Sequence, residues 1–417
     1  MVFFPLPKDV LDIIARYEQN GYHAHIVGGP VRDFLLGIPP HDFDLTTDAT
    51  PEETKAIFQG ERIIETGIQH GTVTLLKSSV PYEITTYRID GEYLDGRHPE
   101  DVTFTRSLAE DLARRDFTIN AMAYAPSEGV IDLFDGRGDL AKNLLRAVGI
   151  PEKRFEEDAL RILRALRFSS RLGFSIEEKT KTAIFSHAHL MRSLATERVM
   201  SELVGILCGR YAERVLSEYQ APLSTVLPEL SVAFTSEKLP FDPKGVLPNP
   251  LANEESIEEN SEQMDTNTLF FARFLILAHR AHLTEKEYTS LCERLHTSRA
   301  LRDGGASILA SLNQTVSTDY DILKLLSSLG EANARLTLEL LVYLGNAQAM
   351  VREQFDRLLA EKRPYEISAL AVKGSDLLAL GYRGVALGET LNALLDATMR
   401  GDLSNTREAL LAFVQKK

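Results

Sequence analysis

The sequence of 417 residues predicts an α/β head, built on a mixed sheet with helices, followed by an elongated, all-α remainder. Up to about residue 150, runs with helical spacing alternate with short β-branched runs, which is typical of a sheet flanked by helices. From Phe155 to about Leu216, and again after Thr268, apolar residues recur at helical spacing. A chain of this length exceeds one ordinary core, so about two to four domains are expected.

The elements of the head follow one another in a regular order. Thr50 is expected to cap a helix, and Ser107 with Glu110 forms a capping-box pattern that opens another. Residues 78–81 are expected to turn between two β-branched strands, and 90–99 is a polar, glycine-rich loop. The expected helices are 8–20, 30–37, 51–59 and one from 108 onward, and the expected strands are 22–27, 41–46, 72–77 and 82–88.

The composition limits the class of protein. With 44% hydrophobic and 25% charged residues, the chain is predicted to be soluble and globular. No apolar stretch approaches the roughly 20 residues of a membrane span, and the N-terminus lacks a signal-peptide pattern. Cys208 and Cys292 lack metal-ligand spacing and are expected to be buried thiols in a reducing compartment. We therefore expect a cytoplasmic protein with no membrane contact and no implied protein partner.

The net charge of −14 argues against broad contact with nucleic acid, which requires positive surface. The charge is unevenly distributed, however. Residues 152–171 hold six basic and four acidic side chains, whereas 253–265 holds six acids and no base. The acidic run is expected to be a solvent loop or linker, which leaves room for a local basic surface.

Two carboxylates flank one apolar residue in the strand-like run 41–46. Side chains alternate faces along a strand, so Asp42 and Asp44 are expected on one side and Phe43 in the core. Two acids this close repel each other unless a cation joins them, and hard oxygen ligands select Mg²⁺, which also takes substrate phosphates. We therefore predict that Asp42 and Asp44 hold Mg²⁺.

A glycine pair precedes this run. Gly28 and Gly29 follow a short apolar strand and allow close backbone approach to a triphosphate. Arg32 follows within the next helix and could contact phosphate, although an ion pair with Asp33 is the alternative. Strand, glycine turn, helix and acidic pair in this order favour nucleotidyl transfer assisted by two metal ions.

A third acid lies on a later strand. In the run 82–88, Tyr82 and Ile84 are expected to face the core and Glu83 the opposite side. Glu83 could complete the carboxylate set, and an ordinary exposed strand glutamate is an equally open interpretation.

The ordered motifs resemble those of class II tRNA nucleotidyltransferases, the family of bacterial CCA-adding enzymes and poly(A) polymerases. The resemblance is dense over 1–175, recurs at 365–411 and is faint between 220 and 345. The motifs are Gly28-Gly29-Pro30-Val31-Arg32-Asp33 with Asp42-Phe43-Asp44, Arg114-Arg115-Asp116-Phe117-Thr118-Ile119-Asn120-Ala121, Asp135-Gly136-Arg137-Gly138-Asp139-Leu140, and Glu157-Asp158-Ala159-Leu160-Arg161 with Arg164 and Arg167.

The resemblance implies a division of the chain and a set of site residues. The implied parts are a catalytic head (1–150), a neck with the base-selecting motif (151–220), a body containing the acidic linker (221–345) and a tRNA-binding tail (346–417). The implied catalytic residues are Asp42, Asp44 and Glu83, with Asp42 and Asp44 as metal ligands. The implied nucleotide-binding residues are Gly28, Gly29, Arg32, Arg115, Asn120, Asp158, Arg161, Arg164 and Arg167.

Base selection can be argued from hydrogen bonding. Cytosine and adenine both present an amino donor beside a ring acceptor, whereas uracil and guanine present the reverse pattern. Asp158 and Arg161, at i and i+3, are expected on one helix face and supply the matching acceptor and donor. Arg164 and Arg167 would reach phosphate or orient Asp158. The alternative is a set of surface salt bridges.

The leading hypothesis is template-independent addition of CCA to tRNA 3′ ends from CTP and ATP. The same motifs also fit an A-adding enzyme or a poly(A) polymerase, and a non-catalytic RNA-binding relative is a further alternative. The loop 90–99 is present at full length, which disfavours a CC-only enzyme because such relatives tend to lack part of it. The sequence leaves open which body and tail residues contact tRNA, and the oligomeric state.

Overall fold

The computed structural model of the protein describes residues 4–40, 42–91, 102–235, 237–240 and 265–415. The loop 90–99 and the acidic segment 253–265 lie almost entirely outside the described residues. The chain forms two compact units, residues 1–270 and 271–417.

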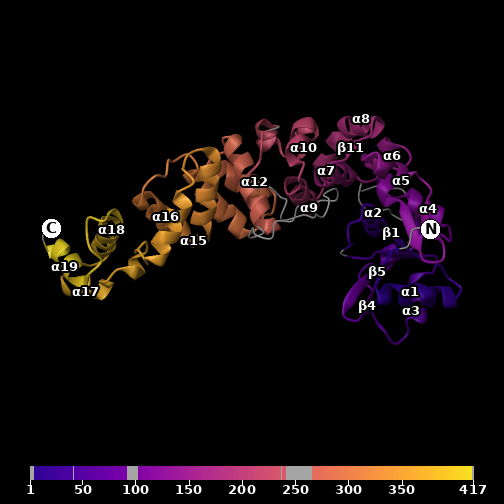
Figure 1. Cartoon of the computed structure of the whole chain (residues 1–417), viewed down its shortest axis with the longest axis horizontal. Coiled ribbons are helices and arrows are strands. Elements are labelled where there is room, and N and C mark those ends of the chain that lie inside the picture. Colours follow the sequence, from indigo (N-terminus) through magenta and orange to yellow (C-terminus); the bar gives the residue numbers. More distant parts are fainter. Residues whose placement is uncertain (1–3, 41, 92–101, 236, 241–264, 416–417) are drawn as a thin grey trace. The chain divides into compact units, whose positions relative to one another are not determined.

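A mixed sheet of seven strands forms the centre of the head, in the order β3-β4-β5-β2-β1-β8-β9. Figure 1 labels β1, β4 and β5 of this sheet. Strands β2 and β5 pair in parallel, and the other neighbours are antiparallel. The predicted mixed sheet is therefore confirmed. The strands are β1 (Ala24–Val27), β2 (Leu45–Thr47), β3 (Arg62–Ile64), β4 (Thr72–Lys77), β5 (Val80–Thr86), β8 (Met122–Ala125) and β9 (Gly129–Asp132).

Two short strand pairs lie outside this sheet. β6 (Arg88–Asp90) pairs antiparallel with β7 (Val102–Phe104), and β10 (Leu144–Leu145) pairs parallel with β11 (Ser175–Ile176). β10 belongs to the head and β11 follows the first long neck helix, so the second pair joins the two parts.

Local sequence signals explain several element boundaries. Thr50 and Glu53 form the capping box of α3, with the Thr50 hydroxyl accepting from the Glu53 N–H. The Ser107 hydroxyl likewise accepts from the Glu110 N–H, but the Glu110 carboxylate accepts from the Thr105 hydroxyl. The helices of the head are α1 (Lys8–Gln19), α2 (Gly29–Leu35), α3 (Pro51–Ile57), η1 (Ile68–His70), α4 (Leu108–Ala113), η2 (Thr118–Asn120) and α5 (Gly136–Ala141).

The hairpin β4–β5 has a tighter turn than expected. Ser78 and Ser79 both adopt positive φ, 49° and 65°, as in the two-residue turns that match strand twist. Residues 80 and 81 already pair with β4. The expected four-residue turn is therefore two residues long.

One face of the sheet is buried in the main core of the head. Ile26, Leu45 and Ile84 share this face because they are direct partners across β1, β2 and β5. Each is at most 1% exposed. The adjacent residues of the three strands therefore turn to the other face, where α4 packs.

The neck is helical, as expected. α7 packs along α9 and ends at Gly173, which adopts the left-handed conformation with φ 77°. Phe168 of α7 meets Phe117 of the head edge to face, with ring centroids 5.9 Å apart. The elements are α6 (Pro151–Glu157), α7 (Leu160–Leu172), α8 (Glu178–His187), η3 (Ala188–Ser193), α9 (Thr196–Leu207), α10 (Ala212–Glu218), α11 (Gln220–Val226) and η4 (Pro228–Ala233).

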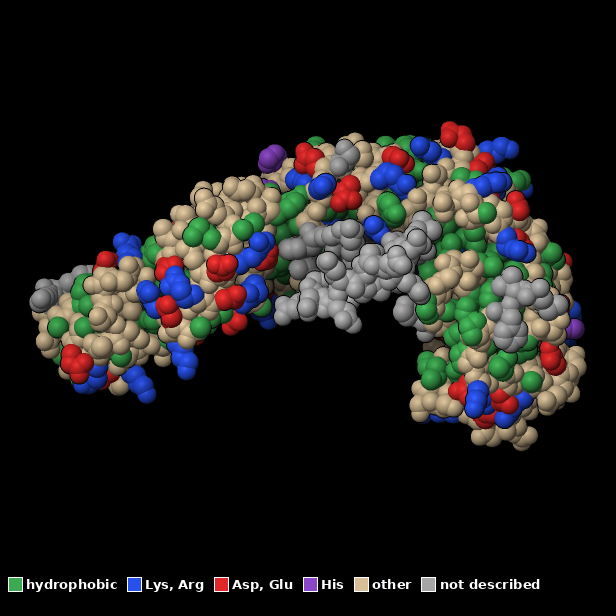
Figure 2. Space-filling model, viewed as in Figure 1, with side chains coloured by type: hydrophobic (Ala, Val, Ile, Leu, Met, Phe, Trp, Pro, Cys, Tyr) green, Lys and Arg blue, Asp and Glu red, His purple; other side chains and the backbone are tan. Residues whose placement is uncertain are grey.

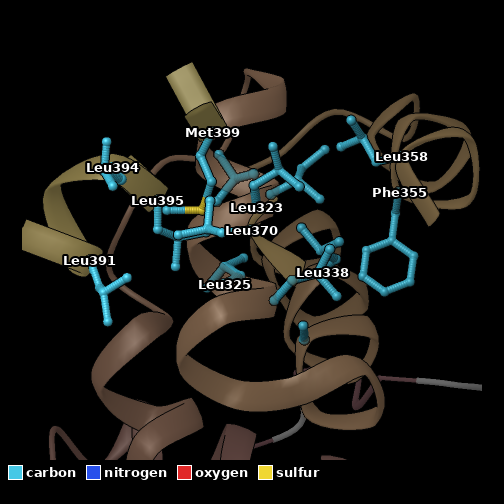
Figure 3. Packing of buried hydrophobic residues seen from close by; sticks show 14 of the residues in the cluster. Leu323, Leu325, Leu338, Phe355, Leu358, Leu370, Leu391, Leu394, Leu395 and Met399 are labelled. Atoms are coloured by element: carbon cyan, nitrogen blue, oxygen red, sulfur yellow. The ribbon is translucent and has the colours of Figure 1, made fainter. Parts of the chain in front are cut away.

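The described part of the second unit is also helical. Figure 3 shows Leu395 and Met399 meeting Leu323 and Leu370 in one apolar core, which also includes Leu394. α15 is interrupted at Gly330, whose φ of 73° and ψ of 168° are not helical. The elements are α12 (Thr266–Arg280), which begins in the first unit, α13 (Glu285–Arg294), η7 (Ala300–Gly304), α14 (Gly305–Ser311), α15 (Asp319–Leu344), α16 (Val351–Ala360), η8 (Ile367–Ala369), α17 (Gly374–Ala379), α18 (Val385–Arg400) and α19 (Arg407–Gln415).

Two further expectations concern the whole chain. Cys208 and Cys292 are both buried and form no disulfide in the described part of the chain, as predicted. Among the described helices, none has the length and hydropathy needed to cross a bilayer.

Candidate active site

The acidic pair lies immediately before β2. The sequence placed Asp42 and Asp44 within a strand, but β2 begins at Leu45. Asp44 nevertheless extends the sheet pairing, because its carbonyl accepts from the Val27 N–H at 3.0 Å. Phe43 is half-buried against Phe34, with ring centroids 6.1 Å apart, so it only partly enters the core.

Strand register brings the third acid to the same place. Leu45 of β2 pairs with Ile84 of β5 in parallel, so Asp44 and Glu83, one residue earlier in each strand, are neighbours on the opposite face. Tyr82 and Ile84 are buried and Glu83 is exposed, as predicted. The expected assembly of Asp44 with Glu83 thus follows from the β2–β5 pairing.

The carboxylates influence one another electrostatically. Partial burial, then the charges of Asp42 and Glu83, raise the pKa of Asp44 to about 6, and nearby Arg115 offsets part of this rise. A bound cation would relieve this repulsion, and the oxygen donors suit a hard divalent ion. Among the described residues, no group of three or more His, Cys, Asp or Glu side chains converges as a metal cluster. The carboxylate oxygens of Asp42 and Asp44 suit a hard ion that takes its remaining ligands from substrate phosphates and water.

A polar cavity of about 210 Å³ opens beside these acids. Two acids, Asp44 and Glu83, and two adjacent arginines, Arg114 and Arg115, are among the residues that line it. Its lining residues are Val27, Asp44, Leu45, Thr72, Glu83, Thr85, Arg88, Arg114 and Arg115. Carboxylates and guanidinium groups around one small cavity are suited to a metal-bound phosphate chain.

Gly28 forms the turn next to this cavity. Its φ is 75°, in the region that favours glycine, and its N–H donates to the Met122 carbonyl at 3.2 Å. A Cβ at this position would lie 3.2 Å from Nη1 of Arg115. Gly28 is therefore needed both for the backbone conformation and for the approach of Arg115, while Gly29 begins α2.

Arg32 and Asn120 lie in one hydrogen-bond chain. Arg32 donates to Asn120 Oδ1 at 2.8 Å and also pairs with Asp33 at 2.7 Å. The Asn120 amide donates to Asp116 at 3.3 Å, and Asp116 pairs with Arg164 at 2.7 Å. Burial alone would raise the pKa of Asp116, but Arg164 and the hydrogen bond from Asn120 hold it below its usual value. The Arg32–Asp33 pair considered as an alternative is thus present, together with a link to the neck.

The segment that the sequence predicted to select the base differs from the expectation. Asp158 and Arg161 do not share a helix face, because α6 ends at Glu157 and Asp158 has extended backbone (φ −147°, ψ 103°). Asp158 instead caps α7 by accepting from the Leu160 N–H at 3.0 Å and pairs with Arg198 at 2.7 Å.

The Arg161 guanidinium points back toward the head. It pairs with Glu157 and donates to the carbonyls of Arg154 and Arg114, each at 3.1 Å. Its side chain is only 10% exposed. Reading a base with Arg161 would therefore require it to exchange partners.

Arg164 and Arg167 also have protein partners. Arg167 pairs with Glu202 at 2.5 Å, and Arg164 pairs with Asp116. Together with Arg32, both place their guanidinium carbons 4.3–5.7 Å from the centre of the Phe168 ring. Phe168 thus gathers cations from head and neck by cation–π attraction.

Sequence reasoning missed Asp111, Arg114 and Thr85 near the site. Asp111 is fully buried, and Arg114 and Thr85 line the cavity. A usable signal exists for Asp111, because an acid at helical spacing between Leu108 and Leu112 falls on an apolar face.

Surface charge in the second unit is balanced locally. On the face drawn in Figure 2, basic side chains lie among acidic ones, so no extended single-sign patch is seen there. Three ion pairs between α15 and α16 illustrate this, namely Arg335–Asp356, Arg352–Glu339 and Arg357–Asp319.

Family models match most of the chain in three consecutive segments. Residues 24–146 match the "Poly A polymerase head domain" and 173–233 the "Probable RNA and SrmB- binding site of polymerase A". Residues 263–414 match "tRNA nucleotidyltransferase domain 2 putative". The first segment contains the acids and the glycine turn described above.

Curated relatives are similar over nearly their whole length. The chain is 36% identical to the CCA-adding enzyme of Enterococcus faecalis, covering 98% of this chain and 96% of the relative. It is 37% identical to the CCA-adding enzyme of Levilactobacillus brevis, covering 99% and 97%.

Solved structures give the same result. The Bacillus stearothermophilus CCA-adding enzyme in complex with CTP superposes with a TM-score of 0.70 at 31% identity, covering 99% of this chain and 98% of that one. The Thermotoga maritima CCA-adding enzyme complexed with tRNA shares the fold, with a TM-score of 0.65 at 21% identity. The chain therefore belongs to the CCA-adding enzyme family of class II tRNA nucleotidyltransferases, whose nucleotidyl transfer depends on a divalent metal ion.

Proposed function

We propose that the protein adds C, C and A to the 3′ end of tRNA from CTP and ATP, without a nucleic-acid template, and releases pyrophosphate. The observation that carries this proposal is the cavity that combines Asp44 and Glu83 with Arg114 and Arg115 beside the Gly28 turn. The relatives named CCA-adding enzymes, similar from end to end, supply the substrate class.

The reaction is attack of the tRNA 3′-hydroxyl on the α-phosphate of the incoming triphosphate. Asp42 and Asp44 would hold Mg²⁺, with Glu83 adjacent to Asp44. When bound, the metal lowers the hydroxyl pKa and neutralises the charge that develops on the leaving pyrophosphate. The acids thus supply an anchored negative charge, and the sheet fixes its position.

The basic groups would bind and orient the triphosphate. Arg115 has an Nε–H that, among the described residues, lacks a hydrogen-bond acceptor, although the atom is buried. Such a donor stabilises an anion that reaches it, since burial strengthens the interaction. Gly28 and Gly29 would line the phosphates, and Arg32 with Asn120 would approach from the neck side.

Asp158 and Arg161 would select the base. A carboxylate and a guanidinium accept cytosine and adenine and leave buried groups unpaired with uracil or guanine, which can give rejection of about 10⁴-fold or more. Arg164 would hold this segment against the head through Asp116, and Arg167 would hold it against α9 through Glu202.

The division of labour along the chain is also a proposal. We assign 1–150 to catalysis, 151–220 to base selection, 221–345 to the body and 346–417 to tRNA binding, with the enzyme acting in the cytoplasm on tRNA acceptor ends. The match of 263–414 to a tRNA nucleotidyltransferase domain supports the assignment of the C-terminal half.

The deciding experiment incubates the protein with tRNA ending in the discriminator base, in C, or in CC, with each triphosphate separately. A CCA-adding enzyme incorporates C on the first two substrates and A on the third. Incorporation of A alone indicates an A-adding enzyme, and long A tails indicate a poly(A) polymerase. Binding of tRNA without incorporation under any condition would favour the non-catalytic relative.

A separate experiment tests the metal requirement. Removal of divalent ions with EDTA should abolish incorporation, and Mg²⁺ should restore it. Restoration by another divalent ion but not by Mg²⁺ would contradict the assignment of the metal while leaving the reaction intact.

A further inference from the structure

Asp111 is a buried charged residue close to the proposed active site. It lies on α4, between Leu108 and Leu112, on the helix face that packs against Val27 and Ala123 of the sheet. Its side chain is 0% exposed. A buried carboxylate is costly unless opposite charges and hydrogen bonds compensate it, so its partners define its role.

Asp111 binds the two adjacent arginines of the cavity. One carboxylate oxygen accepts from Nε and Nη2 of Arg114 at 2.9 and 2.7 Å. The other accepts from Nη2 of Arg115 at 3.3 Å. Burial alone would raise the pKa of Asp111, but the two guanidinium groups hold it below its usual value. One negative charge thus keeps two positive charges together.

The same carboxylate is tied to the strands that carry the acids. The Thr46 hydroxyl lies 3.3 Å from Oδ2 of Asp111 and 3.0 Å from the Thr85 carbonyl. Thr46 follows Asp44 by two residues, and Thr85 follows Glu83 by two residues. Asp111 therefore connects the guanidinium pair to the same two strands on which Asp44 and Glu83 lie.

These contacts aim Arg115 at the cavity. Its Nη2 is held by Asp111, its Nη1 lies beside Gly28, and its Nε–H has no acceptor among the described residues. Without the negative charge of Asp111, Arg114 and Arg115 would repel each other across a partly buried space. We propose that Asp111 is a positioning residue that fixes Arg114 and Arg115 for binding the triphosphate opposite Asp44 and Glu83. This inference rests on the proposed function.

The chain offers a matched control in Asp139. It is also 0% exposed, accepts from Arg146 at 3.0 Å and accepts from the Thr118 hydroxyl at 2.7 Å. Asp139 is not among the residues that line the cavity. Asp111→Asn and Asp139→Asn therefore remove the same buried charge from similar surroundings, one beside the cavity and one away from it.

The test measures kcat and KM for CTP and ATP on full-length variants, with the thermal midpoint of each. Asp111→Asn is expected to raise KM by about 10-fold or more, as loss of charged hydrogen bonds does. Asp139→Asn should lower the thermal midpoint similarly and leave KM unchanged. An unchanged KM in Asp111→Asn, or equal rises in both variants, overturns the proposal.

A double variant separates positioning from general destabilisation. If Asp111 acts through Arg115, then adding Asp111→Asn to Arg115→Ala should change KM by less than about 3-fold, because the groups act as one unit. If Asp111→Asn raises KM as much in the Arg115→Ala background as in the wild type, the proposal is overturned. Should Asp111→Asn fail to fold, Thr46→Val replaces it, with an expected rise in KM of about 3-fold. An unchanged KM in Thr46→Val then also overturns the proposal.

The outcomes also distinguish this inference from the proposed function. Wild-type protein that adds no nucleotide to any tRNA refutes the function itself. Wild-type protein that is active, with unchanged KM in Asp111→Asn, refutes the positioning role alone.

Discussion

The cavity of the head and the charged segment of the neck both contain aspartates and arginines, but these side chains differ in whether the protein itself compensates their charges. In the head, Asp44 has a raised pKa and Arg115 has a buried donor without a described acceptor. In the neck, Asp158 pairs with Arg198, Arg161 with Glu157 and Arg167 with Glu202. At the cavity, Asp44 is repelled by neighbouring acids and Arg115 keeps one donor for a ligand, whereas these three neck residues are already engaged in ion pairs within the protein.

This difference has a thermodynamic meaning. Unsatisfied charges gain free energy when a cation or phosphate joins them, so the head is preorganised for its ligand. Groups that already have protein partners must give them up to bind a ligand. The binding free energy is then only the difference between the interactions with the ligand and those with the protein partners. We therefore expect the head to determine the rate of reaction and the neck to determine discrimination between bases.

The largest effect is expected from the acids of the head. Asp44→Asn should lower kcat for nucleotide addition by more than about 100-fold, because a metal-ligand carboxylate contributes several kcal/mol of transition-state stabilisation. Binding of tRNA, measured by fluorescence anisotropy, should be retained. Asp12→Asn, which removes an exposed partner of Lys77, is the control. Turnover near the wild-type value in Asp44→Asn would remove this residue from the site.

The second prediction concerns selectivity in the neck. Asp158→Ala should relax discrimination against UTP and GTP by about 10- to 150-fold in relative kcat/KM, the value of one charged hydrogen bond. Arg161→Ala should act in the same direction, and the double variant should cost less than the sum. The assay compares the four triphosphates on tRNA ending in CC and on tRNA lacking CCA.

Loss of the helix cap must be separated from loss of selectivity. Asp158 caps α7, and Glu177 caps α8 by accepting from the Thr180 N–H at 2.9 Å. Glu177→Ala should cost about 1 kcal/mol of stability, as cap losses do, with unchanged selectivity. Unchanged selectivity in both Asp158→Ala and Arg161→Ala would leave this segment with a structural role only.

A smaller effect is expected at the glycine turn. Gly28→Ala should weaken binding of CTP and ATP about 10-fold, because the added Cβ displaces a guanidinium that makes charged hydrogen bonds. Gly21→Ala is the matched control, since Gly21 has a similar φ of 81° but no atom within 4 Å of an added Cβ. Both variants should lose about 1–3 kcal/mol of stability, because a Cβ strains the backbone at positive φ. Equal nucleotide affinities in the two variants would contradict the role of Gly28.

The smallest effect is expected at Glu83. Glu83→Gln should lower kcat by about 3- to 10-fold, less than Asp44→Asn, because Asp42 and Asp44 are the proposed primary ligands. Glu65→Gln, another exposed acid of the head, provides the reference. An effect no larger than that of Glu65→Gln would exclude Glu83 from the carboxylate set.

Much of the head could be predicted because its signals are local. The cap at Thr50, the hairpin of β4 and β5 and the alternation around Glu83 all involve neighbours within a few residues, and each was confirmed. The order of the residues also predicted that the glycine turn lies near Asp44, because the turn follows β1 and Asp44 directly precedes β2, the next strand of the chain.

The neck could not be predicted in the same way. Helical spacing placed Asp158 and Arg161 on one face, but capping of α7 by Asp158 breaks the helix between them. Their partners, Arg198 and the Arg114 carbonyl, are about 40 residues or more away in sequence. Long-range pairs of this kind leave no periodic trace, so only the three-dimensional arrangement shows which arginines are already engaged.

The parallel pairing of β2 with β5 has a consequence for changes in chain length. Asp44 and Glu83 are neighbours because each precedes the Leu45–Ile84 pair by one residue. Inserting one residue between Asp44 and Leu45 would turn the acid to the other face of the sheet, since strand side chains alternate. Single-residue insertions and deletions at 43–47 should therefore be far less tolerated than conservative substitutions at the positions of this segment other than the acids. A library of length variants and conservative substitutions at these other positions, selected for growth on tRNA repair, would show that the segment tolerates changes in side chain but not in length.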